Sequence, residues 1–153
     1  MWMEYFNSAE ALRFSNWELG SEDTCKRWID SQVLRYGQTG FALYGVVNKE
    51  TGKMAGQCGL LEQTVDGRPE IEIGYHLIPS AWGNGYATEA ASALRNYAFN
   101  NHIADSLISI ININNIPSQA VAVRNGMKRG ARTTFKEMPV YIYRIEREEW
   151  ERL

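Results

Sequence analysis

The sequence contains little cysteine and little histidine. Its 153 residues include two cysteines, Cys25 and Cys58, and two histidines, His76 and His102. The cysteines do not form a CxxC pair, and the histidines lie far from them in the chain, so the ligand spacing of a zinc site is absent. We therefore expect no bound metal, and two reduced thiols that pack as small hydrophobic side chains.

Long apolar runs and a strong charge imbalance are absent as well. No stretch approaches the ~20 apolar residues that cross a bilayer, and residues 1–10 lack the apolar centre of a secretory signal. A formal net charge of -2 provides no overall field for nucleic acid or anionic membranes. The length and the composition, 44% hydrophobic and 22% charged, fit one globular domain over residues 1–153. We expect a cytoplasmic protein with no direct nucleic-acid or membrane partner.

The first third of the chain has helical patterns. Residues 9–17 form a short amphipathic segment, and the Ser21 side chain can cap a second helix, which we expect to end near Gly37. The apolar positions of this second helix recur at helical spacing and are predicted to face the core. They are Cys25, Trp28, Ile29 and Val33.

Three segments of β-forming residues follow, at 41–47, 54–64 and 70–78, and turn residues separate them. We predict that they pair as an antiparallel meander. The third segment alternates strictly, which places two sets of side chains on opposite faces of the sheet. One set is Ile71, Ile73, Tyr75 and Leu77, and the other is Glu70, Glu72, Gly74 and His76.

The order of elements then changes. Pro79 ends the third strand, a helix reaches about Asn100, and a short apolar strand follows at 106–111, so these two strands should be parallel neighbours. The chain is completed by a helix at 116–124 and by strands at 127–135 and 140–147. The sum predicts an α+β fold, with a mixed, mostly antiparallel sheet of about six strands, one parallel pair and flanking helices.

The segment between the third strand and the following helix carries the clearest chemical signal. Its two glycines let the backbone turn sharply and approach a ligand closely. Together with the helix dipole, the free N–H groups of such a turn bind anions and suit a pyrophosphate. The Lys-Ser/Thr ending of a nucleotide P-loop and the third glycine of a dinucleotide site are missing, and a tight turn that binds nothing is the alternative. The segment consists of Trp82, Gly83, Asn84, Gly85, Tyr86, Ala87 and Thr88.

These residues belong to a longer pattern. It comprises Glu72-Ile73-Gly74-Tyr75-His76-Leu77, the turn followed by Glu89-Ala90, then Asn115-Ile116-Pro117-Ser118 and Asn125-Gly126-Met127. In this order and spacing, the motifs resemble the GNAT superfamily of N-acetyltransferases, and within it the branch of ribosomal-protein N-terminal acetyltransferases and their relatives. The likeness extends over the whole chain, and its specific motifs lie between residues 72 and 127.

The resemblance implies a cosubstrate, acetyl-CoA, and a place for it. The two parallel strands would splay apart and let the thioester pass between them. The turn at 82–88 would bind the pyrophosphate, and the backbone near Leu77 and Ile78 would hold the pantetheine arm. Asn115 and Ser118 match family positions that touch the cofactor near its thiol end. Asn115 is also a natural helix cap, and the two roles are compatible.

The implied reaction is a direct attack of an amine on the thioester in a ternary complex. Most of the amine is protonated at neutral pH, so a base must remove a proton. Glu72 is the candidate, because family enzymes often place a carboxylate beside the cofactor strand; the alternative is a glutamate that faces solvent or pairs with an arginine. His76, on the same face, is the second candidate. Backbone N–H groups at the end of the strand would bind the oxyanion.

Two features depart from the family pattern. Many members carry a tyrosine seven positions after the asparagine as a general acid, and here that position is Ala122. Tyr141 or Tyr143 could substitute for it, and the alternative is that the CoA thiol leaves as the thiolate without a general acid. The usual first strand of the family also has no counterpart at the start of the sequence, which we expect to expose the edge of the strand at 41–47. A homodimer would cover that edge.

The patterns favour an acetyl-CoA-dependent N-acetyltransferase whose acceptor is a primary amine, specifically a protein N-terminal α-amine of the ribosomal-protein type. The alternative acceptor is a small amine, such as a polyamine, an amino acid or an aminoglycoside. It would suit the acids near one hairpin only weakly, because such a cluster is more often a solvated face; they are Glu62, Asp66, Glu70 and Glu72. A CoA-binding module with weak catalysis is compatible with Ala122. An RNA binder is disfavoured by the net charge and by the core-like spacing of Trp2, Trp17 and Trp28.

Overall fold

The computed structural model describes residues 2–153. Its helices are α1 (Met3–Phe6), α2 (Glu22–Thr39), α3 (Tyr86–Asn100), α4 (Ile116–Arg124) and α5 (Arg147–Trp150), with a short 3-10 turn, η1, at Pro79–Ala81. Its strands are β1 (Leu43–Val47), β2 (Met54–Val65), β3 (Arg68–Leu77), β4 (Ser106–Asn112), β5 (Lys128–Phe135) and β6 (Met138–Glu146). Within residues 2–153, no helix has both the length and the apolar character that a bilayer span requires.

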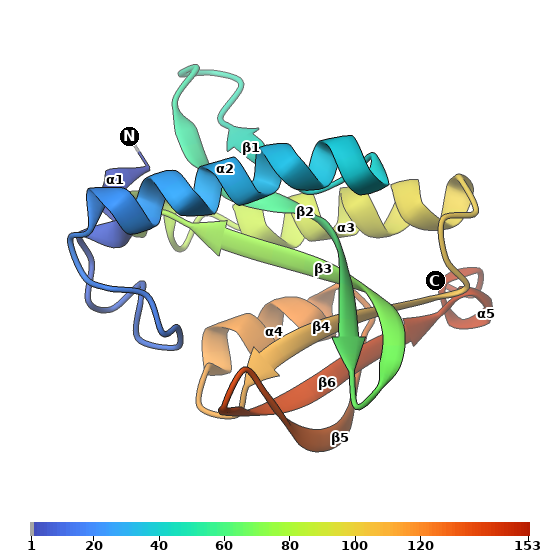
Figure 1. Ribbon diagram of the computed structural model, residues 1–153. Helices are drawn as coiled ribbons and strands as arrows, with labels where there is room; N and C mark the ends of the chain where they lie inside the picture. The colour runs from blue at the N-terminus through green and yellow to red at the C-terminus, as the bar shows by residue number, and fades with distance from the viewer. Residues whose placement is uncertain (1) are drawn as a thin grey trace.

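The six strands form one sheet in the order β1-β2-β3-β4-β6-β5. Neighbouring strands are antiparallel except β3 and β4, which are parallel and share a single register pair, Glu72 with Ile108. Beyond that pair the two strands diverge toward their carboxyl ends (Figure 1). Ser109 Oγ donates to the Ile73 carbonyl oxygen at 2.9 Å and links the strands where the backbone ladder stops. The predicted fold class, with its splayed parallel pair, is confirmed.

Helices lie on both sides of β3. Helices α3 and α4 pack on the face that carries Ile73 and Tyr75, around the buried ring of Phe99. Helices α1 and α2 cover the opposite side, where Tyr5 and Phe6 are buried (Figure 1). A third apolar cluster contains Val65, Ile108, Val140 and Ile142. The strand that leads to the glycine turn is therefore fixed on both faces, as a rigid site requires.

Helix α2 begins where the sequence predicts and ends later. The Ser21 hydroxyl accepts a hydrogen bond from the Thr24 N–H at 3.1 Å, which is the expected N-cap. The helix continues through Gly37 and stops at Gly40, whose φ of 80° is left-handed and whose N–H donates to the Tyr36 carbonyl. The prediction of an end near Gly37 was wrong because the C-cap hydrogen bonds form at the next glycine.

The face of α2 that packs on the sheet also differs from the predicted one. Cys25 is buried and Trp28 is half-buried, as expected, but Ile29 and Val33 are exposed. Gln32 takes the buried position instead. Its Oε1 accepts a hydrogen bond from the backbone N–H at the start of β1 at 3.2 Å, and this bond satisfies a polar group at a buried place.

Strand β1 forms one edge of the sheet, and α2 covers part of it. The Leu43 N–H donates to Gln32, and the Leu43 carbonyl accepts a bond from the Tyr36 hydroxyl. Both groups of Leu43 therefore have partners from the helix. The edge that the sequence predicts to be open is occupied at its first residue.

The helix predicted at 9–17 was wrong, because these residues form a series of turns. Ser8 Oγ accepts from the Ala11 N–H at 3.1 Å, and Ser15 Oγ donates to the Leu12 carbonyl at 2.9 Å. Such local side-chain bonds offer the backbone an alternative to a helical ladder. The helix of this region is instead α1, which the sequence pattern did not indicate.

Candidate functional site

Two glycines shape the turn between β3 and α3. Gly83 and Gly85 have φ angles of 77° and 78°, a left-handed conformation that costs other residues about 1–2 kcal/mol. A Cβ at either position would meet no atom within 4 Å, so the backbone conformation, and not a lack of space, requires glycine. The Asn84 side chain folds back and donates to the carbonyls of Ala81 and Trp82, both at 3.1 Å. Asn84 therefore braces the turn with its side chain.

Successive backbone donors line the outer side of this turn. Within residues 2–153, the N–H groups from Gly83 to Thr88 donate to no acceptor, and the first bond of the helix runs from Glu89 N to Gly85 O at 3.0 Å. The positive end of the α3 dipole lies at the same place. Free N–H groups at a helix start bind anions, so the geometry suits a phosphate or pyrophosphate.

The end of β3 is bound within the chain more fully than the sequence suggests. Trp82 is 40% exposed, and its indole Nε1 donates to the Leu77 carbonyl at 2.9 Å. The Ile78 N–H donates to the Ala55 carbonyl at 2.9 Å. Tyr75 lies two residues before Leu77, so its backbone groups point to the same edge of the strand, toward the diverging β4. The backbone of Tyr75 is thus the part of β3 best placed to meet a ligand between the strands.

A cavity of about 440 Å³ adjoins the glycine turn on the side of the loop between β1 and β2. The Tyr86 side chain forms part of its wall, and the Tyr86 hydroxyl accepts a hydrogen bond from Asn48 Nδ2 at 2.6 Å. Tyr86 therefore offers the turn its N–H group and uses its side chain to fix the neighbouring loop. The other lining residues include Glu4, Lys53, Met54, Ile78 and Ser80.

Glu72 lies at the one position where β3 and β4 pair, just before the strands part. Its carboxylate is half-buried and accepts a hydrogen bond from Gln63 Nε2 at 2.8 Å. Burial raises the pKa of Glu72, and the Gln63 bond, the charges of Lys136 and Arg35 and the backbone of Ile110 oppose that rise. The partner of Glu72 is therefore an amide, not an arginine, and the raised pKa suits a group that takes up a proton.

His76 is enclosed by aromatic rings. Tyr5, Trp17 and Trp28 lie 5.5 to 5.7 Å from the imidazole, measured between ring centroids. The Tyr5 hydroxyl is 3.1 Å from His76 Nδ1, the geometry of a donor facing a neutral imidazole nitrogen. Burial lowers the pKa of His76 to about 4, and the charge of Lys136 adds to this. His76 is therefore a packed, neutral histidine and is poorly suited to act as a general base.

Asn115 and Ser118 lie together at the start of α4. Asn115 Oδ1 accepts from the Ser118 N–H at 3.3 Å, so Asn115 is the helix cap. The Tyr75 hydroxyl donates to the Ser118 carbonyl at 2.9 Å, and Ser118 Oγ donates to the Tyr75 hydroxyl oxygen at 3.2 Å. These bonds connect the diverging end of β3 to α4. One turn later Ala122 is 1% exposed and offers no polar group.

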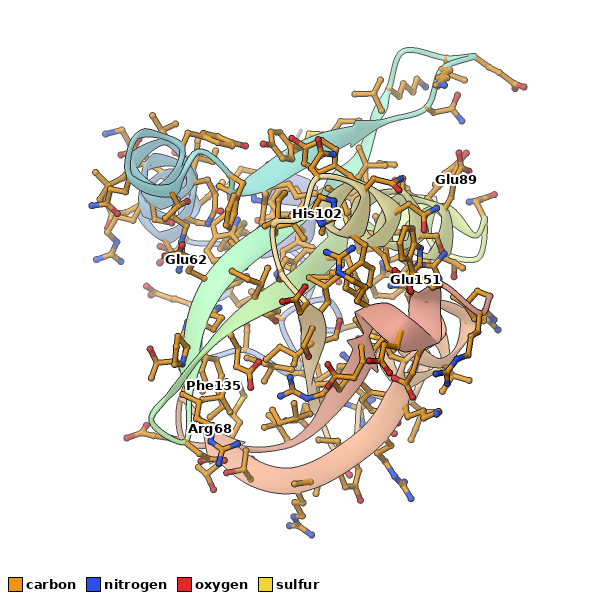
Figure 2. The ribbon with its side chains drawn as sticks, turned by 90° about the vertical axis from the view of Figure 1, so that its right-hand side faces the viewer. Glu62, Arg68, Glu89, His102, Phe135 and Glu151 are labelled. Carbon is orange, nitrogen blue, oxygen red and sulfur yellow. The ribbon has the colours of Figure 1, made fainter. Side chains whose placement is uncertain are left out.

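The four acids near the β2–β3 hairpin do not form one pocket. Glu70 pairs with Arg144 at 3.0 Å, and Asp66 Oδ1 accepts from Thr133 Oγ1 at 2.9 Å. Glu62 is exposed and lies well away from Arg68 at the start of β3 (Figure 2). A cavity of about 640 Å³ between this hairpin and β5 has both acidic and basic walls and does not include the glycine turn. Asp66 and Glu70 line this cavity together with Arg68, Lys128 and Arg144, so its walls are of mixed charge, and Glu62 and Glu72 do not line it.

Neither cysteine is suited to chemistry. Cys25 and Cys58 are both buried free thiols, and burial raises the pKa of both, that of Cys58 to about 12. A thiol with a raised pKa is a poor nucleophile. Within residues 2–153, no three His, Cys, Asp or Glu side chains are grouped so that they could hold a metal ion.

Three contributors to this site were not predicted from the sequence. Gln63 has no motif around it, and only the register of the β2–β3 hairpin brings it to Glu72. Alternation placed the Tyr75 side chain on the apolar face and gave no indication that its hydroxyl contacts Ser118. Ser109 had a signal that could have identified it, because it is the one polar residue in the middle of an apolar strand.

Comparison with known proteins agrees with this geometry. The family described as acetyltransferase (GNAT) domain matches residues 1–128, and the chain belongs to this family. It is 29% identical over 138 residues to YkkB of Bacillus subtilis (strain 168), covering 90% of this chain and 80% of that protein. The family and the homologues named N-acetyltransferases identify an enzyme of the acetyltransferase class.

Two solved structures illustrate the range of proteins with this fold. RimL, a ribosomal L7/L12 α-N-protein acetyltransferase in complex with coenzyme A, has a TM-score of 0.75 and 19% identity, over 94% of this chain and 84% of that one. The aminoglycoside acetyltransferase AAC(6')-Ib, in complex with coenzyme A, has a TM-score of 0.74 and 18% identity, over 98% and 90%. At these identities the likeness concerns the fold, and the acceptors of the two enzymes differ.

Proposed function

We propose that the chain is one acyltransferase domain that uses acetyl-CoA to acetylate a primary amine. The observation that carries this proposal is the row of N–H groups from Gly83 to Thr88, which stands beside the end of β3 where β3 and β4 part. An anion site next to a gap between two parallel strands suits a cosubstrate with a pyrophosphate and a long flexible arm.

In this proposal the pyrophosphate lies on the turn, and the pantetheine arm follows β3 toward Glu72. The Leu77 carbonyl and the Ile78 N–H already have partners, so the amides of the arm would bond to the backbone of Tyr75. Ser118, which contacts Tyr75, would lie near the sulfur. The cap role of Asn115 accounts for its side chain, and its contribution to cofactor binding would be to hold Ser118 in place.

Glu72 would act as the general base. It takes a proton from the attacking amine, the nitrogen forms a bond to the thioester carbon, and the carbon–sulfur bond breaks to give the amide and CoA. A base is most effective when its pKa lies near the working pH, and burial moves the pKa of Glu72 in that direction. Backbone N–H groups of β3 facing the gap would stabilise the oxyanion.

The acceptor that we favour is a protein N-terminal α-amine. The sequence pattern of the ribosomal-protein branch supports it, as does the similarity to RimL in fold. A small polycation would need a pocket with mainly acidic walls. The cavity that Asp66 and Glu70 share is also lined by Arg68, Lys128 and Arg144, and Glu70 is paired with Arg144. A polyamine, an amino acid or an aminoglycoside is the second candidate, which the fold of AAC(6')-Ib accommodates. A CoA-binding or CoA-sensing module with weak catalysis is the third. The location that we propose for all three is the cytoplasm.

The test measures release of free CoA with a panel of acceptors, comprising peptides with different N-terminal residues, polyamines and aminoglycosides. We expect turnover with peptides. Glu72→Gln should lower kcat by roughly 100-fold or more and leave the acetyl-CoA Kd unchanged. The control is Glu62→Gln, an exposed carboxylate on the neighbouring strand. Equal loss of kcat and affinity, or no loss, would remove Glu72 from the mechanism.

A further inference from the structure

Acyl transfer from a thioester benefits from a group that stabilises the departing sulfur, and α4 provides none at Ala122. That residue is 1% exposed and packs in the apolar core. Two other tyrosines near α4 are poorly placed. The Tyr143 hydroxyl is committed to Gln119 Oε1 at 3.0 Å on a side chain that is 3% exposed. The Arg129 guanidinium lies over the Tyr141 ring, and its Cζ is 4.8 Å from the ring centroid.

Tyr75 has the position that these residues lack. It lies three residues beyond Glu72, about 10 Å along the strand, in the part of β3 that no longer pairs with β4. Its hydroxyl crosses to α4, where it contacts Ser118 at 2.9 and 3.2 Å. Ser118 is one helical turn before Ala122, and residues four apart on a helix are neighbours on its surface.

Glu72 and Tyr75 also project from opposite faces of β3. Even-numbered side chains of this strand face α1 and α2, where His76 packs, and odd-numbered ones face α3 and α4. A thioester between the strands would thus have a carboxylate on the side where the amine arrives and a hydroxyl pair on the side where sulfur leaves.

We propose that the Tyr75 hydroxyl, supported by Ser118, donates the hydrogen bond that stabilises the departing CoA thiolate, in place of the hydroxyl missing at Ala122. This inference rests on the proposed function. In the step, the carbon–sulfur bond breaks and its electron pair stays on sulfur as the thiolate. The Tyr75 O–H turns from the Ser118 carbonyl to the sulfur. Ser118 Oγ continues to donate to the Tyr75 oxygen, which strengthens the hydrogen bond from Tyr75 to the sulfur. The proton that finally neutralises the thiolate is the one removed from the amine.

The surroundings of Tyr75 keep it protonated. Burial raises the pKa of its phenol, the Ser118 bond opposes that rise, and the neighbouring Cys58, Glu72 and Tyr143 add to it. A phenol in this state acts as a hydrogen-bond donor over the whole working pH range. It therefore stabilises an adjacent thiolate without ionising itself.

The experiment titrates the thiol of bound CoA and needs no acceptor. The ultraviolet absorbance of the thiolate is followed against pH for the chain saturated with CoA, with the desulfo-CoA complex as the reference. A hydrogen bond to a charged group contributes enough to alter proton affinity about tenfold. We expect Tyr75→Phe to make the bound thiol hold its proton about tenfold more tightly than in the natural chain, with CoA still bound. Ser118→Ala should act in the same direction.

The matched control is Tyr143→Phe, which removes a buried tyrosine hydroxyl bonded to Gln119 and should leave the thiol titration unchanged. Thermal unfolding of each variant establishes that it is folded. A folded Tyr75→Phe variant that binds CoA with the natural thiol titration would overturn the proposal. So would an equal change in Tyr143→Phe, because the effect would then be general. If the natural chain binds no CoA, the proposed function falls, and this inference falls with it.

Discussion

Acidification should destabilise this protein through His76. Burial among Tyr5, Trp17 and Trp28 lowers the pKa of His76 to about 4, whereas a histidine in an unfolded chain has a pKa near 6.5. Between these values the unfolded state binds a proton that the folded state does not. The contribution of His76 to stability is therefore complete above about pH 6.5 and is lost as the pH falls toward about 4.

The size of the effect follows from the change in pKa. At 1.36 kcal/mol for each pKa unit, the loss reaches about 3 kcal/mol, which corresponds to roughly 6–12 °C in Tm for a chain of this length. Protonation of Nδ1 would also replace the acceptor of the Tyr5 hydroxyl with a second donor. Glu72 acts in the opposite direction, because its raised pKa adds stability as the pH falls.

Thermal unfolding followed by circular dichroism, between about pH 8 and pH 4.5, measures the decrease of Tm on acidification. His76→Phe keeps a flat ring among the aromatic neighbours, removes the titration and leaves the Glu72 contribution in place. It should be less stable than the natural chain at neutral pH and lose less Tm on acidification. His102→Gln changes an exposed histidine and should follow the natural profile. Parallel Tm–pH curves for the natural chain and His76→Phe would refute the reasoning.

Three further predictions concern the site and its surroundings. Gln63→Leu removes a donor to Glu72, so the acidic limb of the kcat/KM profile should move to higher pH, and an unshifted limb would argue against Glu72 as the base. Asn115→Ala removes the cap of α4 and should lower the free energy of unfolding by about 1 kcal/mol in denaturant titrations; no loss would contradict the cap role. Homodimerisation would use exposed apolar residues beside the β1 edge, including Val33 and Val47, so Val33→Asp with Val47→Lys should turn a dimer into a monomer in light scattering. A natural chain that is already monomeric would rule this out.

The elements with strong periodicity could be predicted from the sequence. The alternation at 70–78 predicted β3 and the faces of its side chains, and the strand-helix-strand order predicted the parallel neighbour β4. The two glycines predicted the turn that begins α3. Both adopt a left-handed backbone conformation, which residues other than glycine rarely adopt. Local pattern suffices in these cases, since the signal and the structure lie in the same segment.

Features that depend on distant contacts could not be predicted in this way. The segment at 9–17 has apolar residues at helical spacing, yet serine side chains bond its backbone in turns. Gln32 faces inward on α2 only because the first residue of β1 needs an acceptor. The partners of Glu72 and Tyr75 come from β2 and α4, and no single segment contains the information that joins them.

Binding of acetyl-CoA by the glycine turn is the central claim, and calorimetric titration of three chains tests it most directly. The natural chain should bind acetyl-CoA, and Gly85→Glu should abolish binding, because the new carboxylate would stand where the pyrophosphate binds. The matched control is Gly67→Glu in the β2–β3 hairpin, where φ is 76° and a Cβ would also meet no atom within 4 Å. It carries the same backbone strain and the same charge and should bind as the natural chain does. No binding by the natural chain, or equal binding by all three, would contradict the account.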